Sequence, residues 1–302
     1  MIFYSFTILA QVAPQKVILF DSDDTINMTL EFDISYFREH REELRDKGVN
    51  GSITLENGNV IPVEILSRGQ GSMENTNPPY KLKFKQENSQ NTIFQNIKKI
   101  KSFPNPEGDS EAGEKYVMSN YLIYRLLEIY YPYHFKTRMV EINYKDTAKK
   151  IEPFTSRTFL LEPNKVTAKR YDMINVNFEN DPDADDGPAC NASEATGNVE
   201  NEILEKMTAF QFLIGNADHA IPGYQSEMFQ GIASSEKNMK MLKGKDGKYY
   251  PIAYDFDLSG MIDRNCCFIE FSNSLLKPER QDQIPIAVCD REVIKKRKAV
   301  YS

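Results

Sequence analysis

The first half of the chain alternates apolar and polar residues over short stretches, which is the pattern of half-buried strands. Stretches of this kind cover residues 28–34, 52–56, 60–66, 80–85, 135–144 and 157–161. The pair at 52–56 and 60–66 flanks Asn57-Gly58, a dipeptide suited to a hairpin turn with positive φ. A charged stretch at 36–47 favours a helix. This half therefore predicts a sheet with one early helix.

Apolar residues with helical spacing predict two longer helices, at residues 111–131 and 202–214. Between them, Asn164 can cap a short helix that extends to Met173. The sequence pattern changes at Pro163: alternating, strand-like residues come before it, and a predicted helix-rich region with an acidic loop follows. We therefore expect residues 14–162 to form a sheet-rich N-lobe with one packed helix, and residues 163–302 to form a helical C-lobe.

The composition limits the classes of partner. The chain has 302 residues, of which 40% are hydrophobic, and this is enough for one large domain or two packed lobes. A net charge of −7 argues against a nucleic-acid surface. The locally basic stretch 93–101 alternates lysine with apolar residues, as a solvated face does. No segment reaches the roughly 18 apolar residues of a membrane span. We expect neither a nucleic-acid partner nor a membrane span.

The N-terminal residues 1–13 contain an apolar run followed by an Ala-Gln step that resembles the end of a secretory signal peptide. No basic residue precedes the run, and Ile8 is unsuited to its position before the cut, so a buried first strand is the alternative. We expect an extracytoplasmic, periplasmic or secreted, protein. Export would permit a disulfide from Cys266 or Cys267 to Cys289 or Cys190. Their spacing lacks a CxxC motif, and the sequence predicts no zinc site.

The residues from 212 to 261 carry the candidate chemistry. A helix ends in a loop that holds Asp218, and two strands at 239–242 and 249–254 form a ribbon with Asn238 before the first strand and Asp255 after the second. Kinases place a catalytic Asp and metal-binding side chains in this order around ATP. Asp255 and the Asn238 amide supply oxygen ligands for Mg²⁺, and Asp218 can orient an attacking hydroxyl. Asp257 is a second metal ligand or an orienter of the first.

Phosphoryl transfer also needs a cation against the phosphates. Lys81 or Lys83 can supply it, on the strand that follows a Gly-containing turn beginning at Arg68. Alternation places both lysines on one face of the strand, so the sequence does not choose between them. Glu162 lies where an interlobe hinge is expected, and the backbone there can meet adenine. Lys81, Lys83, Arg68 and Glu162 are therefore the candidate nucleotide contacts.

Three motifs carry a family resemblance: Gly-Asn-Ala-Asp at 215–218, Asn-Met-Lys at 238–240, and the segment 251–260 with the string Tyr-Asp-Phe-Asp-Leu-Ser-Gly. Here the chain resembles the CotH-like and HipA-like atypical kinases, and most closely CotH-related secreted bacterial proteins. The resemblance implies an α+β, bilobal kinase-like fold with an antiparallel sheet N-lobe and a mainly helical C-lobe. It also implies a phosphotransferase that uses ATP with Mg²⁺ or Mn²⁺ and acts on an unknown protein or small-molecule acceptor.

Alternatives remain at this point. The gap between Asp218 and Asn238 is long, so Ser226 or Glu227 competes with Asn238 as the second metal ligand. The segment after Arg68 lacks the basic and aromatic residues common in the family, which leaves a non-catalytic kinase-fold binding protein, a pseudokinase of the cell envelope, as the second hypothesis. A third is a structural envelope protein whose acidic loop at 181–187 binds Ca²⁺, although this loop departs from the usual calcium spacing.

Overall fold

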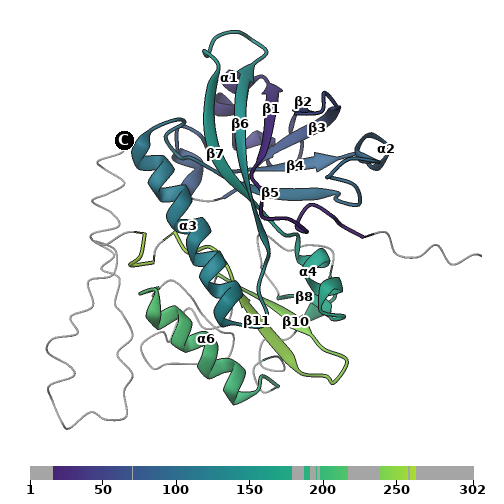
Figure 1. Ribbon diagram of the computed structural model, residues 1–302, viewed down its shortest axis with the longest axis vertical. Helices are drawn as coiled ribbons and strands as arrows, with labels where there is room; N and C mark the ends of the chain where they lie inside the picture. The colour runs from purple at the N-terminus through teal and green to yellow at the C-terminus, as the bar shows by residue number, and fades with distance from the viewer. Residues whose placement is uncertain are drawn as a thin grey trace, which may run out of the picture.

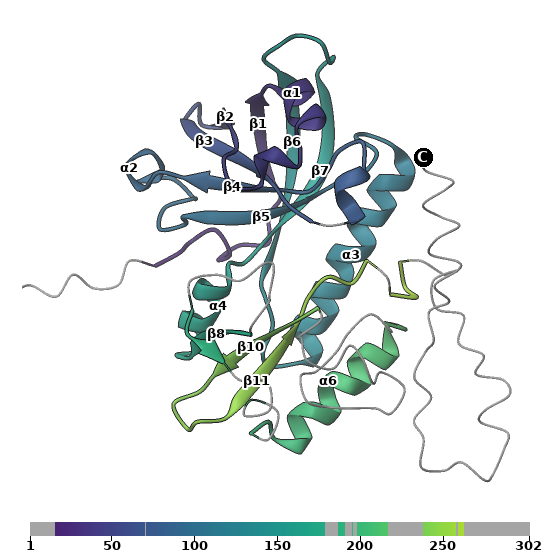
Figure 2. The same ribbon diagram turned by 180° about the vertical axis from the view of Figure 1, so that it is seen from behind.

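The computed structural model describes residues 16–69, 71–178, 187–190, 195, 198–216, 238–257 and 259–262. In Figure 1 a β-barrel occupies the top of the molecule, helix α3 runs down one side of it, and a smaller sheet with α6 lies below. The view from behind in Figure 2 shows the same order of parts. Long helix α3 therefore extends from the barrel to the small sheet.

Seven strands close into the barrel in the order β1-β2-β3-β4-β5-β7-β6. Neighbouring strands pair antiparallel, except that β1 and β6 pair in parallel and close the barrel. Closure leaves no unpaired sheet edge between the first and last strands. The strands are β1 Ile26–Phe32, β2 Val49–Leu55, β3 Val60–Ser67, β4 Tyr80–Phe84, β5 Lys99–Pro104, β6 Thr137–Asp146 and β7 Phe154–Leu161.

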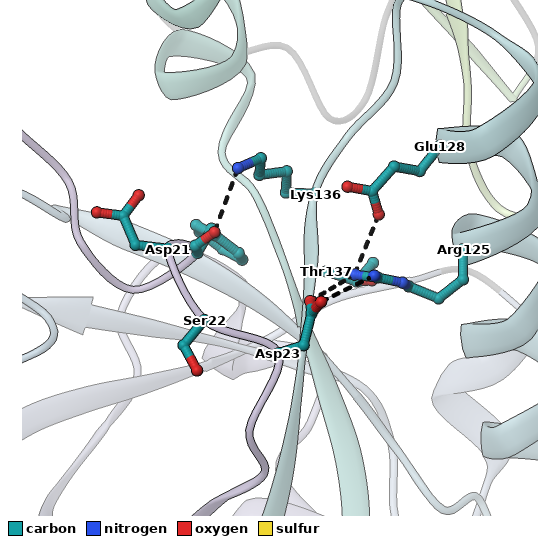
Figure 3. Close-up of a pocket in the computed structure, with 8 residues that line it drawn as sticks. Asp21, Ser22, Asp23, Arg125, Glu128, Lys136 and Thr137 are labelled. Atoms are coloured by element: carbon teal, nitrogen blue, oxygen red, sulfur yellow. Dashed lines mark hydrogen bonds and ion pairs between the residues drawn. The ribbon is translucent and has the colours of Figure 1, made fainter.

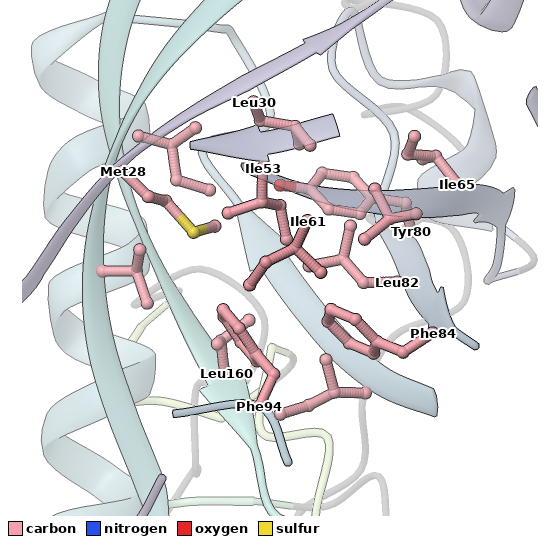
Figure 4. Packing of buried hydrophobic residues seen from close by; sticks show 14 of the residues in the cluster. Met28, Leu30, Ile53, Ile61, Ile65, Tyr80, Leu82, Phe84, Phe94 and Leu160 are labelled. Carbon is pink, nitrogen blue, oxygen red and sulfur yellow. The ribbon is translucent and has the colours of Figure 1, made fainter. Parts of the chain in front are cut away.

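The barrel interior is an apolar core built from alternate strand residues. In β4, Tyr80, Leu82 and Phe84 point inward and are at most 5% exposed, whereas Lys81 and Lys83 between them are partly exposed on the outer face. Figure 4 shows these three residues packed against residues from β1, β2, β3 and β7. In β4, the apolar residues of the period-two pattern therefore point into the barrel, and the polar residues between them point out of it.

A second apolar cluster joins the outer face of the barrel to the rest of the molecule. Helix α3 (Glu111–Tyr130) begins at Ser110, whose hydroxyl accepts the Gly113 N–H at 3.0 Å, and packs against β7 and β6. The cluster continues into the small sheet, whose strand order is β11-β10-β8-β9. One face of α3 therefore makes apolar contacts with both the barrel and the small sheet.

The remaining elements are short. The strands of the small sheet are β8 Ile174–Phe178, β9 Ala189–Cys190, β10 Met239–Lys243 and β11 Tyr249–Ala253. The other helices are α1 Ile34–Glu39, α2 Gln86–Ser89, α4 Asn164–Arg170 and α6 Asn201–Leu213, with 3₁₀ turns η1 Glu43–Arg45 and η2 Gly71–Glu74. None of the helices in the described ranges is long and apolar enough to cross a membrane.

The expected bilobal kinase-like fold with a mainly helical second half is wrong. The first seven strands close into a barrel that includes a parallel pair, and the described residues after Pro163 hold four strands and two helices. Alternation along the sequence identifies strands, but it carries no information about pairing between β1 and β6, which are separated by more than a hundred residues. The helix expected at 36–47 is also divided, because Asp33 caps α1 and the chain turns at His40.

Several expectations lie outside the described residues. These are the possible signal segment at 1–13, most of the acidic loop at 181–187, and the final part of the expected C-lobe from residue 263 onward. Cys190 is buried in β9, and the other three cysteines fall in the undescribed C-terminal range. The proposed disulfides therefore stay predictions.

Candidate functional site

The β10–β11 hairpin brings Asn238 and Asp255 to its open end. Met239 pairs with Ala253, and the Tyr254 N–H donates to the Asn238 carbonyl at 3.1 Å. Asn238 has φ 53° and Asp255 has φ 60°, so both adopt the left-handed conformation, which Asn and Asp tolerate better than most residues. The chain enters β10 just after Asn238 and leaves β11 just before Asp255, so the two left-handed residues lie at the same end of the hairpin. Such conformations carry a cost that is often retained at functional sites.

Helix α3 holds the loop that carries Asp255. The Asp255 N–H donates to the buried Tyr124 hydroxyl at 3.1 Å, and the Tyr131 hydroxyl after the helix donates to the Pro251 carbonyl of β11 at 3.0 Å. Burial, with the nearby charge of Asp255 adding to it, raises the pKa of Tyr124 far above its usual range. Two hydroxyls spaced seven residues apart along the chain thus anchor the small sheet.

Tyr116, about two helical turns before Tyr124 in α3, lies near enough to Asp257 and Asp255 for both charges to act on its hydroxyl. Burial raises the pKa of Tyr116 well above its usual range, and the charges of Asp257 and then Asp255 raise it further. The Tyr116 hydroxyl therefore stays neutral beside the two carboxylates. Sequence reasoning assigned both tyrosines to the core face of the helix, and their helical spacing is the same whether they pack or contact a site.

The two most specific motifs meet in space. Asn216 and Ser259 form an isolated antiparallel bridge, and the Gly260 N–H donates to the Gly215 carbonyl at 3.0 Å. Asn216 is buried, and its side-chain amide donates to the Gln211 side chain at 2.9 Å. Gly215 has φ 64°, where a side chain would be strained. The loop toward Asp218 therefore starts beside the segment that carries Asp255.

The predicted catalytic residue Asp218 lies two positions beyond Asn216, outside the described residues. The alternative metal ligands Ser226 and Glu227 lie in the same undescribed range of 217–237. The choice between Asn238 and either alternative stays a prediction. The described part of the metal set is Asn238, Asp255 and Asp257.

The candidate phosphate cations have different surroundings. The Arg68 guanidinium lies 4.7 Å from the Phe103 ring centre, and Arg68 is 6% exposed. The positive charge of Arg68 acts on the Tyr124 hydroxyl, on which the charge of Asp255 also acts.

The two candidate lysines lie on the outer face of the barrel. Lys83 forms a 2.7 Å ion pair there with Glu64. Lys81 lies opposite Lys101 in the β4–β5 ladder.

The Glu162 carboxylate is occupied by hydrogen bonds and an ion pair within the protein. Glu162 is 3% exposed, and its carboxylate accepts bonds from Arg170 at 2.7 Å and the Thr167 hydroxyl at 2.9 Å, and a 3.1 Å bond from the Lys136 N–H. Its own N–H donates to the Lys136 carbonyl at 2.9 Å. These bonds join the end of β7 to α4. A nucleotide contact at Glu162 would therefore use the backbone carbonyl rather than the carboxylate.

Two lysines that sequence reasoning did not select lie near this loop. Lys101 of β5 and Lys240 of β10 have their Nζ atoms 5.5 Å and 5.4 Å from the Tyr254 ring centre. Lys240 is 1% exposed. In the sequence, the lysine-rich stretch that contains Lys101 has the pattern of a solvated face. For Lys240, the only sign of burial in the sequence is that this charged residue lies between the apolar residues Met239 and Met241.

A separate polar pocket of about 150 Å³ lies between the N-terminal segment and α3 (Figure 3). Arg125 donates to Asp23 at 2.7 and 3.1 Å and pairs with Glu128 at 3.1 Å, and Lys136 donates to the Phe20 carbonyl at 3.3 Å. Ligand pockets usually enclose about 300–1,000 Å³. The small volume and the internal ion pairs favour a structural role, fastening residues 20–23 to α3.

No family model matches the chain, and no curated protein matches it. The site must therefore be judged from its own residues. Within the described ranges, no group of three or more His, Cys, Asp or Glu residues is placed to hold a metal ion. A site of two carboxylates and an amide, with the remaining positions taken by phosphate oxygens and water, is still the kind of oxygen donor set that Mg²⁺ and Mn²⁺ accept.

Proposed function

We propose that this chain is an ATP- and divalent-metal-dependent phosphotransferase related to the CotH-like proteins, with its site at the open end of the β10–β11 hairpin. The supporting observation is the placement of Asp255, which has a left-handed backbone, donates its N–H to Tyr124, and lies next to Asn238. The proposal rests on this site and not on the fold.

Each residue has a proposed role. Asp255, the Asn238 amide oxygen and Asp257 would hold Mg²⁺ or Mn²⁺, and the bound ion would neutralise charge on the transferring phosphoryl group. Arg68 and Lys81 would contribute positive charge from the barrel side. Asp218 would accept the proton of the acceptor hydroxyl and orient it for attack.

Isothermal titration calorimetry of the whole chain with ATP, with and without MgCl₂ or MnCl₂, tests this proposal. We expect binding that requires the metal, together with slow release of ADP when water serves as the acceptor. Binding without turnover under any metal would favour the alternative of a non-catalytic binding protein. Absence of metal-dependent binding would contradict the phosphotransferase proposal.

A further inference from the structure

Two consecutive residues of helix α6, Phe210 and Gln211, support the two ends of the turn that carries Asp257. The Ser259 N–H donates to the Phe256 carbonyl at 2.9 Å, and Asp257 lies in the turn that this bond closes. Phe256 is 0% exposed, and its ring packs against that of Phe210 with the ring centres 6.2 Å apart. Figure 1 shows the end of α6 beside this segment, which follows β11. An aromatic contact therefore anchors the first end of the turn to α6.

The other end of the turn is joined to α6 through Asn216. Ser259 forms an antiparallel bridge with Asn216, and the Gly260 N–H donates to the Gly215 carbonyl at 3.0 Å. Asn216 is in turn bonded twice to Gln211. The Asn216 backbone N–H donates to the Gln211 carbonyl, and its side-chain amide donates to the Gln211 Oε1, both at 2.9 Å. Gln211 thus holds the residue with which the end of the turn pairs.

The Gln211 side chain is polar on the buried side of α6. The other buried residues of this helix are apolar, namely Ile203, Met207 and Phe210. Gln211 is 0% exposed, and burying an amide costs free energy unless its hydrogen bonds are made. Within the described part of the chain, the Gln211 Nε2 has no hydrogen-bond partner. An apolar side chain of this length would avoid that cost, so the bond to Asn216 is the feature that a glutamine supplies here.

We infer that Gln211 is a positioning residue for the candidate metal site. Through its bond to Asn216 it fixes the end of the turn that carries Asp257, which is partly exposed and lies two residues beyond Asp255. The assignment of these aspartates to a divalent ion rests on the proposed function. Groups that orient metal ligands change metal affinity by about 10–100-fold when they are removed.

Gln211→Met tests this role, because methionine has nearly the same length but is only a weak acceptor for the Asn216 amide. Electron paramagnetic resonance of free Mn²⁺, with and without ATP, measures metal affinity. Hydrogen–deuterium exchange measures the protection of the Ser259 and Gly260 amides. Met207→Val is the matched control, because Met207 is also 0% exposed and lies one turn before Gln211 in α6.

We expect Gln211→Met to weaken Mn²⁺ binding about 10–100-fold. The Ser259 and Gly260 amides should exchange faster in this variant, relative to the amides of the barrel core. Met207→Val should lower the thermal unfolding temperature and keep the Mn²⁺ affinity of the wild type, because it leaves a cavity without changing the bond to Asn216. Unchanged Mn²⁺ affinity in folded Gln211→Met, or equal losses of affinity in both variants, would overturn the inference.

The wild type provides the test if Gln211→Met does not fold. Its Ser259 and Gly260 amides should exchange as slowly as those of the β10–β11 ladder, because both are hydrogen-bonded in the joined segments. Exchange of both at the rate of an unprotected amide would overturn the inference.

The inference and the proposed function fail in different ways. If the wild type binds Mn²⁺ and Gln211→Met binds it equally well, the inference fails and the proposed function stands. If the wild type binds no Mn²⁺, with or without ATP, the proposed function fails, and the exchange measurement alone decides whether Gln211 fixes the turn.

Discussion

The hydroxyl of Tyr124 accepts a hydrogen bond from the backbone N–H of Asp255 at 3.1 Å, across 131 residues of sequence. This bond connects the long helix packed on the barrel with the loop that carries the candidate metal ligands. The Asp255 backbone has φ 60°, and the bond to Tyr124 helps to hold that conformation. The helix α3 is therefore a positioning element for the site.

Substitution Tyr124→Phe should destabilise the loop. The change removes the acceptor of the Asp255 N–H without altering the ring, and an unpaired buried N–H costs about 1–3 kcal/mol. We expect a matching fall in the free energy of unfolding and weaker metal-dependent ATP binding, measured by urea unfolding and calorimetry. Tyr130→Phe is the control, since Tyr130 is 44% exposed on the same helix. Equal effects of the two changes would contradict this role for Tyr124.

The pH dependence of stability should reflect the buried tyrosines. In the barrel core, Tyr80 and Tyr144 share a 2.8 Å hydrogen bond, and burial raises the pKa of Tyr80 to about 12. The pKa of Tyr80 is higher in the folded protein than the value of about 10 expected in the unfolded chain. The contribution of neutral Tyr80 to the free energy of unfolding is therefore complete below about pH 10 and is lost as the pH rises toward 12. Unfolding experiments across that interval should show the loss. Tyr80→Phe should reduce the dependence on pH, and an unchanged profile would contradict the assignment.

The Glu162–Arg170 pair should contribute to stability and not to nucleotide affinity. Arg170→Met leaves a buried carboxylate without its cation, and breaking such a pair costs about 3–5 kcal/mol. The double variant Glu162→Met with Arg170→Met removes both charges and should recover much of that loss in urea unfolding. Glu162→Gln should bind ATP as the wild type does where it is folded. Loss of ATP binding in folded Glu162→Gln would show that the carboxylate contacts the ligand.

Asp218→Asn should separate binding from chemistry. The proposed role of Asp218 is to orient the acceptor hydroxyl, so ATP binding should be retained while turnover falls by roughly 10²–10⁴, the usual effect of losing a positioned acid or base. Calorimetry and ADP release measure the two quantities. If ATP binding is lost together with turnover, Asp218 belongs to the nucleotide or metal site instead.

The local elements of the fold were predictable from the sequence. The expected ribbon at 239–242 and 249–254 corresponds to β10 and β11, and the Asn57-Gly58 turn joins β2 and β3. Alternation and turn residues carry this information because both depend on neighbours in the chain. Closure of the barrel depends instead on the pairing of Ile26 with Val140, which no local pattern specifies. The expected bilobal fold failed for that reason.

The candidate site also has one part that local sequence patterns predict and another part that they do not. The approach of Asn238 to Asp255 follows from hairpin geometry, which the strand pattern contains. The contacts of Tyr124 with Asp255 and of Lys101 with Tyr254 join elements far apart in the sequence. A lysine that alternates with apolar residues has the same sequence pattern on a solvated strand and on a strand covered by a second sheet. Its position therefore required the structure.

Metal-dependent ATP binding by Asp255→Asn, compared with Asp172→Asn, tests the central claim most directly. Asp172 is the matched control, because it also has a left-handed backbone, at φ 56°, but its side chain is exposed and pairs with Lys245. The account predicts that Asp255→Asn loses the Mg²⁺- or Mn²⁺-dependent component of ATP binding in calorimetry while Asp172→Asn retains it. Full metal-dependent binding by Asp255→Asn, in a protein that unfolds as the wild type does, would contradict the account.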